Sequence, residues 1–119
     1  MSAQLACMTS DVPAGTALRV ELEGETGVVE VAVVRDDEGT LHAISDICSH
    51  GQVSLSDGEV DGCTIECWLH GSRFDLRTGA PSGPPAVAPV AVHRASVGDD
   101  GTVVVSLAPT DQPTDERNR

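Results

Sequence analysis

Two stretches of this sequence decide how the rest is interpreted, Cys48-Ser49-His50-Gly51 and Cys67-Trp68-Leu69-His70-Gly71. Each contains one cysteine and one histidine at short spacing, and sixteen residues, 51–66, lie between the two pairs. If a hairpin brings the pairs together, two thiols and two imidazoles can surround one small volume as metal ligands. The pattern therefore predicts a metal centre on four residues: Cys48, His50, Cys67 and His70.

Zinc and iron–sulfur centres both use such ligands. Zinc fingers usually pair cysteine with cysteine and histidine with histidine along the sequence. Here each stretch supplies one of each, which suits a binuclear iron cluster better, because both thiolates can bind one iron and both imidazoles the other. The remaining alternative is four unrelated core residues, although two matched pairs in a glycine-rich segment rarely arise by chance. The residue pattern therefore favours an iron–sulfur cluster, and a zinc site remains an alternative.

The segments outside these stretches have the patterns of β-strands. Alternation is clearest in Ala17–Glu23, where Leu18, Val20 and Leu22 face one side and charged residues the other. No segment has a strong helical period. We expect strands over Leu5–Met8, Ala17–Glu23, Val28–Arg35, Leu41–Ile47, Thr64–Trp68, Arg73–Leu76, Val90–Val97 and Thr102–Leu107. The fold class predicted is all-β, an antiparallel β-sandwich or barrel with a loop-rich insertion in the middle third.

The two cysteine–histidine stretches resemble the cluster-binding loops of the Rieske proteins, which hold one [2Fe–2S] cluster. The resemblance continues through Arg73-Phe74-Asp75 and Thr78-Gly79, and Ser82-Gly83-Pro84-Pro85-Ala86 is similar to the proline loop that covers the cluster in this family. It extends over roughly residues 4–107 and is strongest toward the stand-alone bacterial Rieske ferredoxins, including those of ring-hydroxylating dioxygenase systems.

The resemblance implies a Rieske domain over residues 1–107, with a cluster-binding subdomain at about 46–83. Residues 108–119 are polar and contain proline, so they are expected to form a disordered tail. The resemblance also implies the roles of the ligands. Cys48 and Cys67 would bind the inner iron through thiolates, and His50 and His70 would bind the outer iron, near the surface.

The ligand set and its surroundings predict a low reduction potential for a Rieske centre. High-potential Rieske proteins have a disulfide between the loops, at the positions of Val53 and Leu69 here, and a serine and a tyrosine that bond cluster sulfurs. Ser72 matches the serine, but Phe74 stands at the tyrosine position without a hydroxyl. Negative charge also disfavours adding an electron, and residues 46–75 hold one arginine against Asp46, Asp57, Glu59, Asp61, Glu66 and Asp75. We expect a potential of about −150 mV, at the low end of the Rieske range.

Composition excludes several partners and favours one compartment. The net charge is −12 and lysine is absent, so binding to nucleic acid or to an anionic membrane surface is not expected. No stretch reaches the roughly 20 apolar residues of a membrane span, and residues 1–11 lack the features of a signal peptide. We therefore expect a cytoplasmic protein with reduced cysteines.

The cysteines and histidines outside the motif are expected to have structural roles or to be exposed. Cys63 and Cys7 are read as packed thiols, and His42 and His93, which lie in strand patterns, as structural or exposed residues. Trp68 either shields the cluster from water or fills the small core of the insertion.

The chain is expected to be a one-electron carrier rather than an enzyme. It has no glycine-rich dinucleotide fingerprint and no space for a mononuclear iron domain. The resemblance implies that electrons arrive from a flavoprotein reductase and leave to a terminal oxygenase or another oxidoreductase. Two alternatives are an accessory protein of iron–sulfur cluster assembly and a small Rieske-like subunit of a nitrite reductase-type enzyme.

Overall fold

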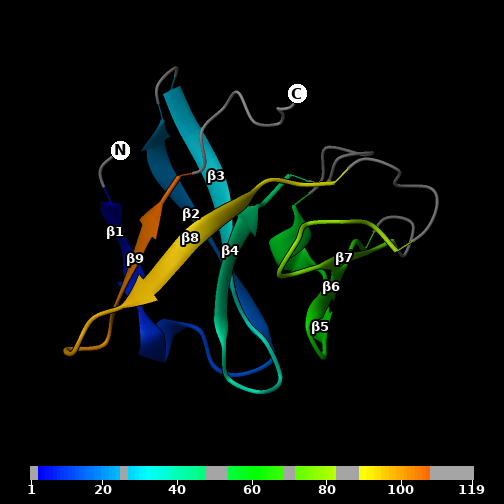
Figure 1. Ribbon diagram of the computed structural model, residues 1–119, viewed down its shortest axis with the longest axis horizontal. Coiled ribbons are helices and arrows are strands. Elements are labelled where there is room, and N and C mark those ends of the chain that lie inside the picture. The colour runs from blue at the N-terminus through cyan, green and yellow to red at the C-terminus, as the bar shows by residue number, and fades with distance from the viewer. Residues whose placement is uncertain (1–2, 25–26, 48–53, 69–71, 83–88, 108–119) are drawn as a thin grey trace.

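A computed structural model describes residues 3–24, 27–47, 54–68, 72–82 and 89–107. These residues form nine strands and two short 3-10 helices, and they contain no α-helix (Figure 1). The strands are β1 (Ala3–Met8), β2 (Thr16–Gly24), β3 (Gly27–Arg35), β4 (Leu41–Ser45), β5 (Glu59–Asp61), β6 (Thr64–Glu66), β7 (Arg73–Asp75), β8 (Val92–Val97) and β9 (Thr102–Ser106). The 3-10 helices are η1 (Thr9–Asp11) and η2 (Leu55–Asp57). The predicted all-β class is confirmed.

The strands form two antiparallel sheets of different size. The larger has the order β1-β9-β8-β4-β3-β2, and the smaller has the order β5-β6-β7. Figure 1 shows the small sheet, in green, beside the larger one. Among the described residues, no helix is long and apolar enough to cross a membrane.

One glutamine side chain joins the two ends of the large sheet. The side-chain nitrogen of Gln4 on β1 donates to the carbonyl of Glu23 on β2 (2.9 Å), and its side-chain oxygen accepts from the Glu23 amide (2.8 Å). The Gln4 amide thus makes the pair of hydrogen bonds that a strand backbone would make. This bridge nearly closes the sheet into a barrel.

Strand β3 separates two hydrophobic cores. Val31 and Val33 are buried in the interior of the large sheet, whereas Ala32 and Val34 are buried in a second core shared with the small sheet. Because both faces of β3 are covered, its valine run shows no polar alternation. The neighbouring β2, by contrast, keeps Arg19, Glu21 and Glu23 exposed, as predicted.

The structure differs from the expected strands at several places, among them β1, which begins earlier, at Ala3, and β6, which ends earlier, at Glu66. β4 ends at Ser45, because Ile47 leaves the sheet to bridge with Ser54. β8 begins at Val92, because the Val90 amide bonds the carbonyl of Gly79 instead of a neighbouring strand. β5 is not among the expected strands, because its three residues include only one apolar side chain and so show no alternation of apolar and polar residues. The proposed boundaries at 46–83 and 1–107 stay predictions, and the tail 108–119 lies outside the described residues.

Replacement of Gln4 by alanine is expected to open the seam between β1 and β2. The change removes two hydrogen bonds at a partly exposed site, so we expect a loss of about 1 kcal/mol in the free energy of unfolding. Thermal denaturation measures the loss, with Arg94→Ala on the exposed face of β8 as the control. Equal melting temperatures for the Gln4→Ala variant and the unaltered protein would contradict the bridging role.

Candidate functional site

Cys67 lies at the point where the small sheet meets one of the two motif segments. It follows β6 directly, is fully buried, and belongs to the same core as Leu55, Ile65 and Phe74. Its amide donates to the carbonyl of Ser72 (2.7 Å), which joins the two ends of the 68–71 segment just before β7. Of the four predicted ligands, Cys48, His50 and His70 lie outside the described residues.

Asp46 holds together the residues on either side of the other motif segment. Its carbonyl accepts from the amide of Leu55 (2.6 Å), and its Oδ1 accepts from the amide of Ser56 (2.8 Å). Ile47 and Ser54 form a bridge next to these bonds. Residues 46–47 and 54–56, which lie on either side of this motif segment, are therefore fixed to each other.

The first motif segment lies between β4 of the large sheet and η2, and the second follows β6 of the small sheet. Glu59 pairs with Glu66 across β5 and β6, immediately before Cys67. Gly58 packs so tightly that a Cβ atom at this position would collide with the Glu66 carbonyl. Leu55 and Cys67 share one core. This arrangement fits a cluster held by both segments, because η2, which follows the first segment, packs against the end of β6, which precedes Cys67.

Charge at the base of the site is mainly negative. The Asp46 side chain is fully buried, and its Oδ2 lies 3.6 Å from Nε of Arg19. Arg19 is shared with the exposed Glu21 and with Glu30 (3.0 and 2.9 Å). A buried carboxylate with a shared, partly exposed counter-ion retains much of its negative potential.

The neighbouring acidic residues also share their cations. Arg73 lies 3.5 Å from Asp61 and 3.4 Å from Glu66, so that one positive charge serves two carboxylates. Arg77 lies 3.5 Å from Asp75, and hydrogen bonds from the Arg77 backbone and side chain help to hold the pKa of Asp75 below its usual value.

Two aromatic residues near the motif have different environments. Phe74 is fully buried and pairs with Ile65 on β6 and with Pro81. Trp68, directly after Cys67, has 53% of its surface exposed. Of the two interpretations of Trp68, filling the insertion's core is therefore wrong, and shielding of the cluster from water stays a prediction.

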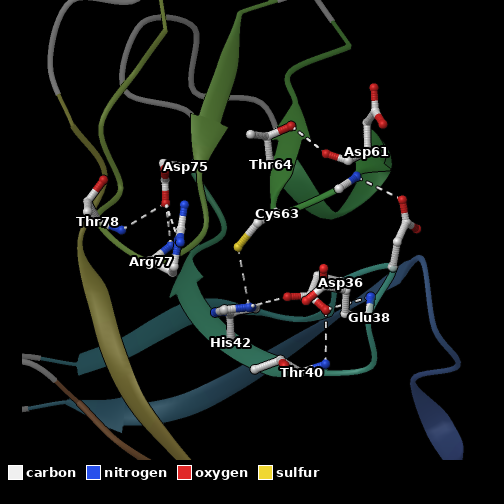
Figure 2. Close-up of polar contacts among 12 residues, drawn as sticks. Asp36, Glu38, Thr40, His42, Asp61, Cys63, Thr64, Asp75, Arg77 and Thr78 are labelled. Atoms are coloured by element: carbon white, nitrogen blue, oxygen red, sulfur yellow. Dashed lines mark hydrogen bonds and ion pairs between the residues drawn. The ribbon is translucent and has the colours of Figure 1, made fainter.

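A second group of ligand-type side chains lies outside the motif (Figure 2). The Oδ2 atom of Asp36 lies 2.9 Å from Nε2 of His42, and Sγ of Cys63 lies 3.8 Å from the same nitrogen. Burial raises the pKa of the Cys63 thiol. Burial also acts to raise the pKa of Asp36, but hydrogen bonds from His42, Thr40 and Glu38 outweigh it and lower that pKa.

Sequence reasoning treated His42 and Cys63 as separate structural residues. They are 21 positions apart and no ligand spacing connects them, because their contact arises from the packing of one sheet on the other. Cys7, also read as a packed thiol, lies half-buried on β1, and His93 is buried on β8.

Comparison with known proteins relates this chain to iron–sulfur proteins over nearly its whole length. A profile of the Rieske [2Fe–2S] domain family matches residues 2–104. The ferredoxin CarAc of Metapseudomonas resinovorans is 38% identical over 100 residues, which cover 84% of this chain and 89% of CarAc. The 3-phenylpropionate/cinnamic acid dioxygenase ferredoxin subunit of Escherichia coli K12 is 37% identical over 109 residues, covering 91% of this chain and 95% of that subunit.

Solved structures show the same relationship. The ferredoxin of carbazole 1,9a-dioxygenase from Nocardioides aromaticivorans IC177 superposes with a TM-score of 0.79 at 32% identity, covering 91% of this chain and all of the ferredoxin. A chain from the complex of reduced oxygenase and oxidised ferredoxin in carbazole 1,9a-dioxygenase superposes with a TM-score of 0.74 at 36% identity, covering 87% of this chain and all of that chain.

Substitution of Gly58 by alanine is expected to disturb the site through the backbone. The new Cβ would push the Glu66 carbonyl, and with it Cys67, away from η2, at a cost of about 1–3 kcal/mol in folding free energy. We expect a lower melting temperature and less iron bound per chain, measured by calorimetry and metal analysis. Gly62→Asn is the matched control, because Gly62 has a φ of +62°, in the left-handed region that asparagine adopts, and nothing lies near its Cβ position. Full iron content in Gly58→Ala would contradict this role.

Proposed function

The chain belongs to the family of Rieske [2Fe–2S] domains, and on this basis we propose that four residues hold its single cluster. Cys48 and Cys67 bind one iron through thiolates, and His50 and His70 bind the other through imidazole nitrogens. The observation that supports this assignment most strongly is the position of Cys67, buried at the edge of the small sheet beside the base of the 48–53 segment. When bound, the cluster accepts and releases single electrons.

The function that follows is one-electron transfer between proteins. A flavoprotein reductase supplies the electron, and a terminal oxygenase receives it. Three relatives support this function: one at 38% identity is named a ferredoxin, one at 37% is named a dioxygenase ferredoxin subunit, and a chain at 36% was solved in a complex of oxygenase and ferredoxin. They favour the carrier over the two alternatives, a cluster-assembly accessory protein and a nitrite reductase subunit.

The residues of this chain contribute position and charge. Asp46 fixes the base of one motif segment, and the bond from Cys67 to Ser72 fixes the base of the other. The net charge of −12 favours partners with a basic docking surface and makes the association rate fall with rising salt. It also disfavours nucleic acids and anionic membranes as partners.

A cytoplasmic location agrees with the state of the cysteines. Cys7 and Cys63, which are not among the proposed cluster ligands, form no disulfide among the described residues. Free thiols persist in reducing compartments, whereas secreted proteins usually pair their cysteines.

Cluster binding and electron uptake are expected to depend on Cys67. The purified protein should contain two irons per chain and accept one electron from NADH when the reductase of a Rieske dioxygenase system is present. Cys67→Ser should abolish the visible absorption and the EPR signal of the reduced cluster. Cys7→Ser, which alters a half-buried thiol on β1, should change neither. A colourless, EPR-silent protein with stoichiometric zinc would refute the assignment.

The midpoint potential is expected near −150 mV, at the low end of the Rieske range. Phe74 has no hydroxyl to donate to the cluster, and the buried carboxylate of Asp46 disfavours added negative charge. Asp46→Asn should therefore raise the midpoint, by an amount on the order of tens of mV. Asp57→Asn, at an exposed position of η2, should raise it less. A redox titration measures both shifts, and a midpoint well above zero in the unaltered protein would contradict the low-potential assignment.

A further inference from the structure

We propose that Asp36, His42 and Cys63 form a second metal site, which binds one Zn²⁺ ion where the two sheets meet. The three donor atoms, Asp36 Oδ2, His42 Nε2 and Cys63 Sγ, all lie within 4.8 Å of one another. The ligand types are those that zinc uses in proteins. This inference does not depend on the proposed electron-transfer function.

The orientation of the three side chains favours a metal-binding site over a site with a nucleophilic cysteine. In a nucleophilic Cys–His–Asp arrangement, the cysteine and the aspartate contact opposite nitrogens of the imidazole. Here both contact Nε2, at 3.8 Å for Cys63 and 2.9 Å for Asp36 (Figure 2). The donor atoms therefore converge on one another rather than forming a relay.

The separations are close to those of a tetrahedral zinc site. Zn–N and Zn–S bonds of roughly 2.0 and 2.3 Å place nitrogen and sulfur ligands roughly 3.6 Å apart, and nitrogen and oxygen ligands roughly 3.3 Å apart. The contact between His42 and Cys63, at 3.8 Å, is close to this length and needs to shorten only slightly. The contact between Asp36 and His42 needs to widen by a few tenths of an ångström.

Hydrogen bonds from the backbone hold the ligands in place. Oδ1 of Asp36 accepts from the amides of Glu38 and Thr40, both at 2.9 Å, which directs Oδ2 toward His42. His42 lies on β4, paired with Val34 of β3. The carbonyl of Cys63 accepts from the Leu76 amide (2.9 Å), which fixes the turn between β5 and β6. Each ligand is thus positioned by main-chain bonds that zinc would leave intact.

A second set of bonds ties the two turns together. Oδ2 of Asp37 accepts from the Gly62 amide (2.8 Å), and the Asp37 amide donates to the Gly62 carbonyl (3.3 Å). The turn between β3 and β4 therefore stays next to the turn between β5 and β6. A metal bound here would connect the large sheet to the sheet that carries Cys67.

The site is sheltered yet open to one further ligand. The side chains of Asp36 and His42 are 7% and 11% exposed, and the three ligands line a pocket whose rim includes Thr40 and Arg77. Water in this pocket can occupy the fourth coordination position. On binding zinc, Cys63 releases its thiol proton to water, and His42 binds through an unprotonated Nε2, because the proton that Nε2 shares with Asp36 in the metal-free protein moves to Nδ1 or leaves to water. One carboxylate and one thiolate then balance the charge of the ion, while Arg77 stays beside Asp75.

Equilibrium dialysis of the cluster-containing protein against Zn²⁺ tests the site. The protein is first treated with a mild chelator, and zinc and iron are then measured together with the visible spectrum. We expect one zinc per chain with unchanged iron, and a higher melting temperature in zinc. Cys63→Ser and His42→Gln should each lose the bound zinc and the thermal shift. Cys7→Ser should keep both.

Cadmium gives a second readout that reports the thiolate itself. Cd²⁺ bound at this site should produce an ultraviolet thiolate-to-metal absorption band that is absent in Cys63→Ser. No zinc uptake by the unaltered protein, equal uptake by Cys63→Ser, or uptake coupled to loss of iron would each overturn the proposal. Because iron and zinc are measured separately, failure here is distinguishable from failure of the cluster assignment.

Discussion

The burial of β3 on both faces is the constraint on which the rest of the structure depends. Val31 and Val33 pack inside the large sheet, while Ala32 and Val34 pack against the small sheet. One backbone strand therefore forms the wall between two cores. A shift of register by one residue would exchange the two sets of side chains, so neither sheet can move along β3 without losing its own core.

This shared wall explains how a small, loop-rich unit can hold a cluster precisely. Ile65, Cys67 and Phe74 extend the core that Ala32 and Val34 begin. The three short strands of the small sheet would be marginal alone, since a few residue pairs with one apolar face bury little surface. Packed against β3, they become part of a continuous hydrophobic core. Cys67, at the edge of the small sheet, is held in place by the same packing.

The sequence predicted the outer strands better than it predicted the contacts between the sheets. Leu18, Val20 and Leu22 have the expected alternation because β2 is exposed on one side. The run Val31–Val34 could be identified as a strand, but nothing in it indicated that two cores divide its residues. The meeting of Asp36, His42 and Cys63 was not predicted for a similar reason: it depends on how the sheets pack, which local patterns do not encode. Spacing indicated the four motif residues as metal ligands, and that assignment stays a prediction, because only Cys67 lies in the described residues.

The bridge made by Gln4 has a consequence for how copies of the protein behave toward each other. A carrier must collide repeatedly with its partners without adhering to itself. Open sheet edges work against this, because unpaired amides and carbonyls on one molecule accept a strand from another. The Gln4 amide engages the backbone of Glu23 at the seam where β1 and β2 would otherwise present such edges. A single polar side chain thus helps to keep contacts between molecules brief and reversible.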